Sequence, residues 1–167
     1  MDACANGCVK SPSRALDPPY TSNRVNNLSA AHHPSAGDTS ILVVDDEEDI
    51  REFLQELLAG EGCTTAGMPN GQLALEWLAS SPDVPALILL DLMMPEMDGW
   101  QFLDHADQEP RLRGIPIAIM SAHPSVRNAY NGRGAHFGAF FLLPKPIDVP
   151  RLLAIVAGVM PPVNAPL

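Results

Sequence analysis

Three aspartates follow predicted strands and are the residues best suited to carry chemistry. Asp45 and Asp46 come directly after the apolar run 41–44, and Asp91 directly follows the run 86–90. Because ligands of an open parallel sheet lie beyond the carboxyl ends of its strands, we expect these carboxylates to share one pocket. Like charges in a small cleft repel unless a cation joins them, and oxygen ligands suit Mg²⁺, with Mn²⁺ as a possible substitute. A single aspartate here would usually be a helix cap, but three favour a metal site.

A hydroxyl and an ammonium complete this set. Ser121 ends the fourth predicted strand and Lys145 ends the fifth, so both side chains are expected over the same sheet edge. A tetrahedral phosphoryl group fits between them and leaves the Asp91 carboxylate in line with phosphorus. Taken singly, a lysine before a proline is an ordinary surface residue and a serine after a strand is a turn former. Together with the aspartates they favour phosphoryl transfer.

Strand and helix patterns alternate along the chain. Continuous apolar runs predict strands at 41–44, 63–66, 86–90, 115–120 and 140–143. Helices are predicted by an apolar stripe (Ile50, Phe53, Leu54, Leu57, Leu58), by the capping residues Asn70 and Asp148, and over 99–106. The glycine-rich segment 123–138 is a poor helix former. We therefore expect the α/β class: a flavodoxin-like, doubly wound parallel sheet of five strands, order 2-1-3-4-5, with helices on both faces.

Composition divides the chain into one domain and two flanking segments. Residues 1–38 contain four prolines, equal numbers of acidic and basic residues and no periodic apolar pattern, which predicts a disordered arm. Residues 161–167 contain three prolines and predict a flexible tail. The intervening 39–160 carries the whole net charge of −10 and has the length of one compact domain.

Charge and apolar content exclude several classes of partner. The acidic balance and the lack of any Lys/Arg run argue against nucleic acid, and the longest uncharged apolar stretch, 152–160, is too short for a membrane span. No secretory signal is visible and three cysteines are too few for a disulfide framework, so a cytoplasmic location is expected. Cys4, Cys8, His32 and His33 have loose spacing for a metal site and are interpreted as solvated residues of the arm.

Four segments resemble the signature of receiver domains of response regulators in two-component signalling. They are VDDE at 44–47, LDLMMPEMDG at 90–99, MSA at 120–122 and GAFFLLPKP at 138–146. The resemblance covers essentially all of 39–160. It implies a phosphoacceptor, Asp91; Mg²⁺ ligands from Asp45, Asp46, Asp91 and the main-chain carbonyl of Met93; phosphoryl contacts from Ser121 and Lys145; and a cis bond between Lys145 and Pro146.

Three residues differ from the family pattern or flank the phosphoryl site. Leu142 occupies a place where the family usually has Tyr or Phe, with Phe140 and Phe141 beside it instead. The resemblance gives Met93 and His123 a role in setting how long the phosphate survives. Core packing would equally explain Met93, and His123 before a proline would equally begin a helix.

The resemblance implies a single-domain regulator of the chemotaxis type. It would take a phosphoryl group from a histidine kinase or a histidine phosphotransfer protein and act as a monomer or weak dimer through protein contact, because no further domain follows 160. Its only catalysis would be its own phosphorylation and dephosphorylation. The alternative is a pseudo-receiver that only binds a partner, which the intact acidic and basic residues oppose. A haloacid-dehalogenase-type phosphatase needs a second aspartate where this chain has Met93.

Overall fold

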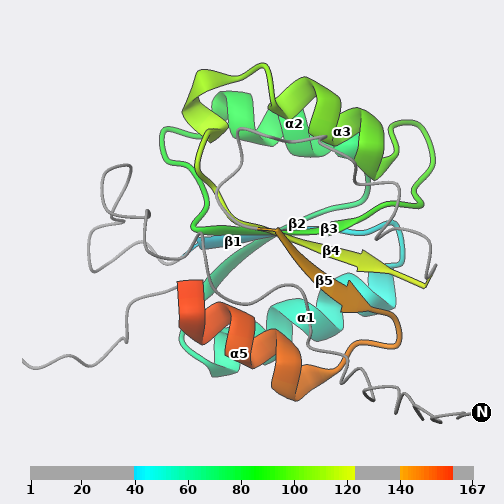
Figure 1. Cartoon of the computed structure of the whole chain (residues 1–167), viewed down its shortest axis with the longest axis vertical. Helices are drawn as coiled ribbons and strands as arrows, with labels where there is room; N and C mark the ends of the chain where they lie inside the picture. Colours follow the sequence, from blue (N-terminus) through cyan, green and yellow to red (C-terminus); the bar gives the residue numbers. More distant parts are fainter. Residues whose placement is uncertain (1–39, 123–139, 160–167) are drawn as a thin grey trace, which may run out of the picture.

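Five parallel strands form the centre of this computed structural model, which describes residues 40–122 and 140–159 (Figure 1). The strands are β1 (Ser40–Val44), β2 (Thr64–Met68), β3 (Leu87–Asp91), β4 (Ile117–Ser121) and β5 (Phe140–Pro144). Their order in the sheet is β2-β1-β3-β4-β5, and every neighbouring pair is parallel. The predicted fold class and strand order are confirmed.

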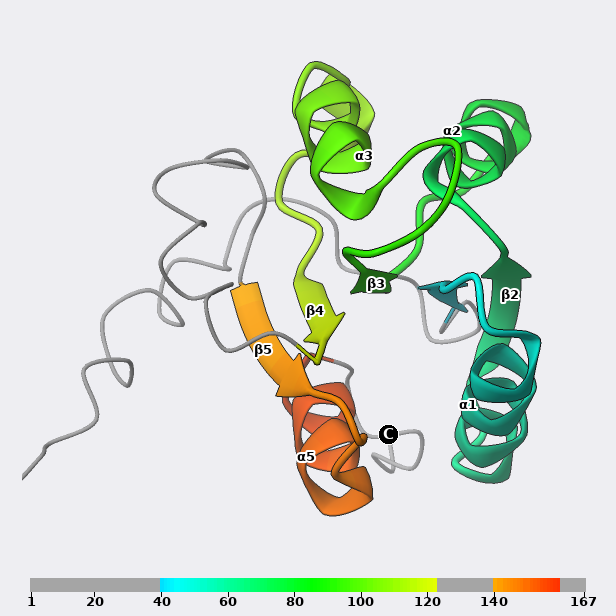
Figure 2. The same ribbon diagram turned by 90° about the vertical axis from the view of Figure 1, so that its right-hand side faces the viewer.

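Helices cover both faces of this sheet. They are α1 (Glu48–Gly60), α2 (Gly71–Ser80), α3 (Gly99–Ala106) and α5 (Val149–Val159), with a short 3-10 turn, η2 (Pro110–Leu112). Figures 1 and 2 show α2 and α3 on one face and α1 and α5 on the other. In the part of the chain that is described, no helix has the length and apolar character needed to cross a membrane.

The core consists of two apolar layers, one on each side of the sheet. In β1, Leu42 and Val44 pack with α2 and α3, whereas Ile41 and Val43 pack with α1 and α5. Successive side chains of a strand point to opposite faces, so each central strand supplies both layers. This two-sided burial explains why the strands read as continuous apolar runs rather than as alternating patterns.

The buried face of α1 is narrower than its apolar stripe. Leu54 and Leu58 are fully buried, but Phe53 is 47% exposed. Consecutive helix residues are rotated by about 100°, so a stripe centred on Leu54 leaves Phe53 at its edge. Phe53 therefore belongs to the predicted apolar stripe but lies at its exposed edge.

Capping side chains set the beginnings of three helices. The Leu73 amide donates to Asn70 Oδ1 at 2.8 Å, and the Arg151 amide donates to Asp148 Oδ1 at 3.1 Å, which confirms both predicted caps. Asp98 caps α3 through a reciprocal capping box with Gln101, which was not predicted from the sequence. These caps place the first turn of each helix close to the carboxyl edge of the sheet.

Strand boundaries differ from the predicted ones by up to two residues. β4 begins only after Pro116, because proline has no amide hydrogen to donate to a neighbouring strand. β2 runs from Thr64 to Met68 rather than over 63–66 and stops before Pro69. The predicted arm 1–38, tail 161–167 and glycine-rich segment 123–138 lie outside the described residues.

Candidate functional site

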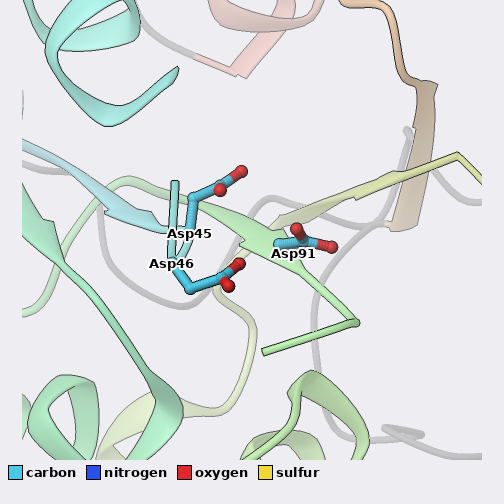
Figure 3. Close-up of side chains that lie close together, drawn as sticks. All are labelled: Asp45, Asp46 and Asp91. Atoms are coloured by element: carbon cyan, nitrogen blue, oxygen red, sulfur yellow. The ribbon is translucent and has the colours of Figure 1, made fainter. Parts of the chain in front are cut away.

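Three carboxylates meet at the carboxyl edge of the sheet. Asp45 and Asp46 follow β1, and Asp91 is the last residue of β3, which pairs with β1 in parallel register. One carboxylate oxygen from each aspartate lies within 4.8 Å of the others (Figure 3). Asp45 and Asp91 are buried, whereas Asp46 is exposed. The structure thus brings together the three aspartates that the sequence placed at one edge.

The loop between β1 and α1 is fixed by hydrogen bonds to its main chain. The Glu47 amide donates to Asp45 Oδ1 at 3.0 Å, which orients that carboxylate. From the first turn of α1, Arg51 Nη1 donates to the carbonyl oxygens of Asp45 at 2.7 Å and Asp46 at 3.1 Å. Arg51 was not among the predicted site residues. The sequence indicates it only weakly, as a basic residue in the first turn of a helix that begins with acidic residues.

The loop after β3 holds Asp91 from the other side. The Met93 amide donates to Asp91 Oδ1 at 3.0 Å, and the Gly99 amide donates to the Leu92 carbonyl at 3.2 Å. The Met93 side chain is 71% exposed. Core packing therefore does not explain Met93, whose main chain contacts the site while its side chain lies in solvent.

Lys145 brings a positive charge into the carboxylate cluster. Its Nζ lies 2.6 Å from Asp91 Oδ2, 2.9 Å from Asp45 Oδ2 and 3.2 Å from Glu47 Oε1. The Lys145–Pro146 peptide bond is cis, as the resemblance implied. Glu47 is a fourth carboxylate that was not predicted to belong to the site, although it directly follows the aspartate pair.

Two further predicted residues lie on the neighbouring strands. Ser121 is buried at the end of β4, and its carbonyl oxygen accepts from the Lys145 amide at 3.0 Å. Leu142 of β5 is half-buried and packs against the apolar layer under α2 and α3. The two residues thus occupy adjacent strands near the cluster, while His123 lies outside the described residues.

Burial and neighbouring charges shift the pKa values of Asp45 and Lys145. Burial raises the pKa of Asp45 above its ordinary value, and this outweighs the opposing effects of Lys145 and the Glu47 amide. For Lys145, burial acts to lower the pKa, but the hydrogen bond to Asp91 and the ion pair with Asp45 raise it above its usual range. The lysine is therefore charged at neutral pH, in contact with two buried carboxyl groups.

The donor set fits a hard divalent cation. Asp45 Oδ2 is buried and forms an ion pair with Lys145, but it accepts no well-directed hydrogen bond from the described residues. A buried carboxylate oxygen without a directed donor, next to two further carboxylates, is the environment that an oxygen-preferring ion such as Mg²⁺ completes. The aspartate cluster is thus chemically able to hold the predicted ion.

The fold and the residues at its carboxyl edge define the class of two-component receiver domains. The family model described as the response regulator receiver domain matches residues 41–157. The chain belongs to this family, and the resemblance drawn from the sequence is confirmed.

Relatives and solved structures agree with this assignment. The chain is 39% identical over 116 residues to the DNA-binding transcriptional regulator NtrC of Escherichia coli, covering 70% of this chain and 24% of NtrC. It is 33% identical to the response regulator Rre1 of Synechocystis over 72% of this chain and 51% of Rre1. It is also similar to the chemotaxis protein CheY4 of Vibrio cholerae, with a TM-score of 0.64, 25% identity and coverage of 74% and 99%. The chain thus spans about a quarter of NtrC and half of Rre1.

Proposed function

We propose that this chain is a response regulator that accepts a phosphoryl group on Asp91 in a Mg²⁺-dependent step. The observation that carries the proposal is the convergence of Lys145 Nζ on Asp91 Oδ2 at 2.6 Å inside a cluster of three aspartates. Phosphoryl transfer needs mainly position and compensating charge, and this cluster supplies both. The donor would be a histidine kinase or a histidine phosphotransfer protein, as is usual for receiver domains.

Each site residue has a distinct part in the proposed reaction. A carboxylate oxygen of Asp91 attacks phosphorus, the bond from phosphorus to the donor nitrogen breaks, and the imidazole keeps the electron pair. The Met93 amide orients Asp91 through Oδ1, so we expect Oδ2 to form the new bond. Lys145 then contacts a phosphoryl oxygen instead of Oδ2, and the Ser121 hydroxyl donates to a second one.

The metal ligands in this proposal come from the β1–α1 loop, the end of β3 and the loop after β3. They are the carboxylates of Asp45, Asp46 and Asp91 and the main-chain carbonyl of Met93. Bound Mg²⁺, or Mn²⁺ in its place, supplies positive charge that offsets the negative charge of the phosphoryl oxygens. The protein itself supplies the fixed carboxylates and the lysine.

The proposed output is a contact with another protein. The net charge of −10 opposes direct binding to nucleic acid, so the DNA-binding activity of NtrC is not carried over. Monomeric or weakly dimeric behaviour in the cytoplasm remains our prediction. A pseudo-receiver would have no need for an intact lysine and aspartate cluster, which favours the phosphoryl-accepting function.

A mass measurement tests this function directly. Acetyl phosphate with Mg²⁺ should add about 80 Da to the intact chain, and a chelator should prevent the gain. Asp91→Asn should show no gain and keep the fold, because the substitution preserves the shape of the side chain. The matched control is Asp104→Asn at an exposed site on α3, which should be phosphorylated like the wild type. An unchanged wild-type mass would contradict the proposal.

A further inference from the structure

One side chain links the start of α2 to the loop that follows the expected phosphoacceptor. Asn70 Nδ2 donates to Glu96 Oε2 at 2.6 Å, although 26 residues separate the two along the chain. Asn70 is only 6% exposed, and its Oδ1 accepts from the Leu73 amide to cap α2. The two ends of one amide group therefore serve two elements at once.

A second hydrogen bond joins the loop after β3 to the first residue of α2. The Gly71 amide donates to the Met97 carbonyl at 3.1 Å. A Cβ at position 71 would lie 2.8 Å from Met97 Cγ and 3.0 Å from its carbonyl oxygen, so any larger residue would force Met97 to shift. The loop thus rests directly on the first turn of α2.

Glu96 adopts a conformation that its own side chain does not favour. Its φ is +65°, in the left-handed region where a Cβ crowds the following carbonyl. Such a residue keeps this conformation only when its surroundings hold it. The short hydrogen bond from the buried Asn70 amide is a support of this kind, since it joins a fixed donor to a carboxylate.

We propose that Asn70 is a positioning residue for the phosphoacceptor site. By holding Glu96 in its left-handed conformation, it fixes the path of the loop 92–98, which carries the main chain of Met93 beside Asp91. The Met93 amide orients Asp91, and the Met93 carbonyl is the expected Mg²⁺ ligand. The relevance of this positioning to phosphorylation rests on the proposed function. The hydrogen bond between Asn70 and Glu96 does not depend on that function.

The competing explanation is that Asn70 is a helix cap and nothing more. Asn70→Asp separates the two roles, because it keeps the oxygen that caps α2 but replaces the donor with a carboxylate facing Glu96. Glu96→Gln is the matched control, since its amide oxygen still accepts from Asn70. The double variant Asn70→Asp with Glu96→Gln exchanges donor and acceptor and restores a hydrogen bond of opposite direction.

Hydrogen exchange in the metal-free protein tests whether the Asn70–Glu96 hydrogen bond holds the loop 92–98 in place. In Asn70→Asp, amides of 92–99 should exchange several-fold faster than in the wild type, whereas those of α2 should be unchanged because its cap remains. Glu96→Gln and the double variant should resemble the wild type. Wild-type exchange in Asn70→Asp, or no recovery in the double variant, would overturn the proposal.

Mg²⁺ titration calorimetry then tests whether the Asn70–Glu96 hydrogen bond positions the expected Mg²⁺ ligands. We expect Asn70→Asp to weaken Mg²⁺ binding by roughly three- to tenfold, the range for the loss of one typical hydrogen bond, with recovery in the double variant. Faster exchange with unchanged Mg²⁺ affinity would overturn the positioning role. If the wild type binds neither Mg²⁺ nor a phosphoryl group, the proposed function and the positioning role both fail. The exchange experiment still decides whether the Asn70–Glu96 hydrogen bond holds the loop.

Discussion

Lys145 Nζ lies 2.6 Å from Asp91 Oδ2 and 2.9 Å from Asp45 Oδ2, so one ammonium contacts two buried carboxyl groups, one at the end of β3 and one directly after β1. A charge-assisted contact of this kind is strong when both partners are withdrawn from water. Its loss leaves buried charge without compensation, which costs more than the pair itself contributes. Lys145 is thus expected to matter for stability as well as for phosphoryl transfer.

Replacing Lys145 should therefore affect two measurements. We expect Lys145→Gln to lower the free energy of unfolding of the metal-free protein by about 3 kcal/mol, because Asp45 and Asp91 lose their shared cation. Phosphorylation by acetyl phosphate should slow at least about tenfold. Urea unfolding and intact mass spectrometry measure the two effects. Glu47→Gln removes only the exposed contact of Lys145 and should change stability by less than about 1 kcal/mol; equal losses in both variants would contradict this expectation.

The raised pKa of Asp45 gives the stability of the metal-free protein a defined dependence on pH. Since burial raises the pKa above 3.8, the folded protein holds this proton more tightly than the unfolded chain does. The stabilising contribution of protonated Asp45 is complete below pH 3.8. It is lost as the pH rises through the pKa of Asp45 in the folded protein. The raised pKa of Lys145 acts with the same sign but at alkaline pH, so its stabilising contribution is complete below pH 10.5 and is constant across this acidic range.

Asp45→Asn should consequently stabilise the metal-free protein at pH 7, because it removes a carboxyl group whose burial disfavours the ionised form. The advantage should shrink as the pH approaches 3.8, where the wild-type residue becomes neutral as well. Urea unfolding in the presence of a chelator, at several pH values, measures the difference. An advantage that does not change with pH would show that ionisation of Asp45 is not its cause.

Mg²⁺ should stabilise the protein through the same carboxylates. An ion that binds only the folded state at about 100 times its Kd raises the free energy of unfolding by about 2.7 kcal/mol. Asp46→Asn should abolish this gain while leaving the metal-free stability nearly unchanged, since Asp46 is exposed. Thermal melts with and without Mg²⁺ provide the measurement, and Asp104→Asn should retain the full shift.

Two adjacent residues of α1 allow a matched test of its buried face. Leu54 is fully buried, whereas Phe53 is 47% exposed. Leu54→Ala should cost about 2.7–5.0 kcal/mol of stability because it leaves a cavity in a packed layer. Phe53→Ala should cost less than about 1 kcal/mol. Urea unfolding compares them, and a larger loss from Phe53→Ala would mean that this ring is covered in solution.

The fold and most of the cluster follow from local sequence patterns. Strands buried on both faces read as apolar runs, and their alternation with amphipathic helices specifies a parallel sheet. Residues directly after such strands lie at one edge, which is why the sequence alone suffices to predict that Asp45, Asp91 and Lys145 lie together.

The contacts that orient these residues could not be predicted in this way. Arg51 reaches the carbonyl oxygens of the β1–α1 loop, and Asn70 reaches Glu96, through loop paths that hydrophobic periodicity does not encode. The exposure of Phe53 depends on the width of the buried stripe rather than on its period. Periodicity therefore specifies the elements, whereas the fine orientation of the site depends on individual polar side chains.

Gly99, the first residue of α3, packs against the end of β3, and a side chain there should disturb the site. A Cβ at this position would overlap the Asp91 carbonyl oxygen and lie 2.8 Å from Leu92 Cα. Because these neighbours are main-chain atoms, Gly99→Ala must displace the end of β3 that carries Asp91, which we expect to cost about 1–3 kcal/mol and to slow phosphorylation by acetyl phosphate. Gly158→Ala is the control: it lies in α5 with nothing within 4 Å, so alanine should stabilise the helix by about 0.5–1 kcal/mol. Urea unfolding and the time course of the mass gain distinguish the two variants, and normal phosphorylation of Gly99→Ala would show that the site tolerates movement of this strand.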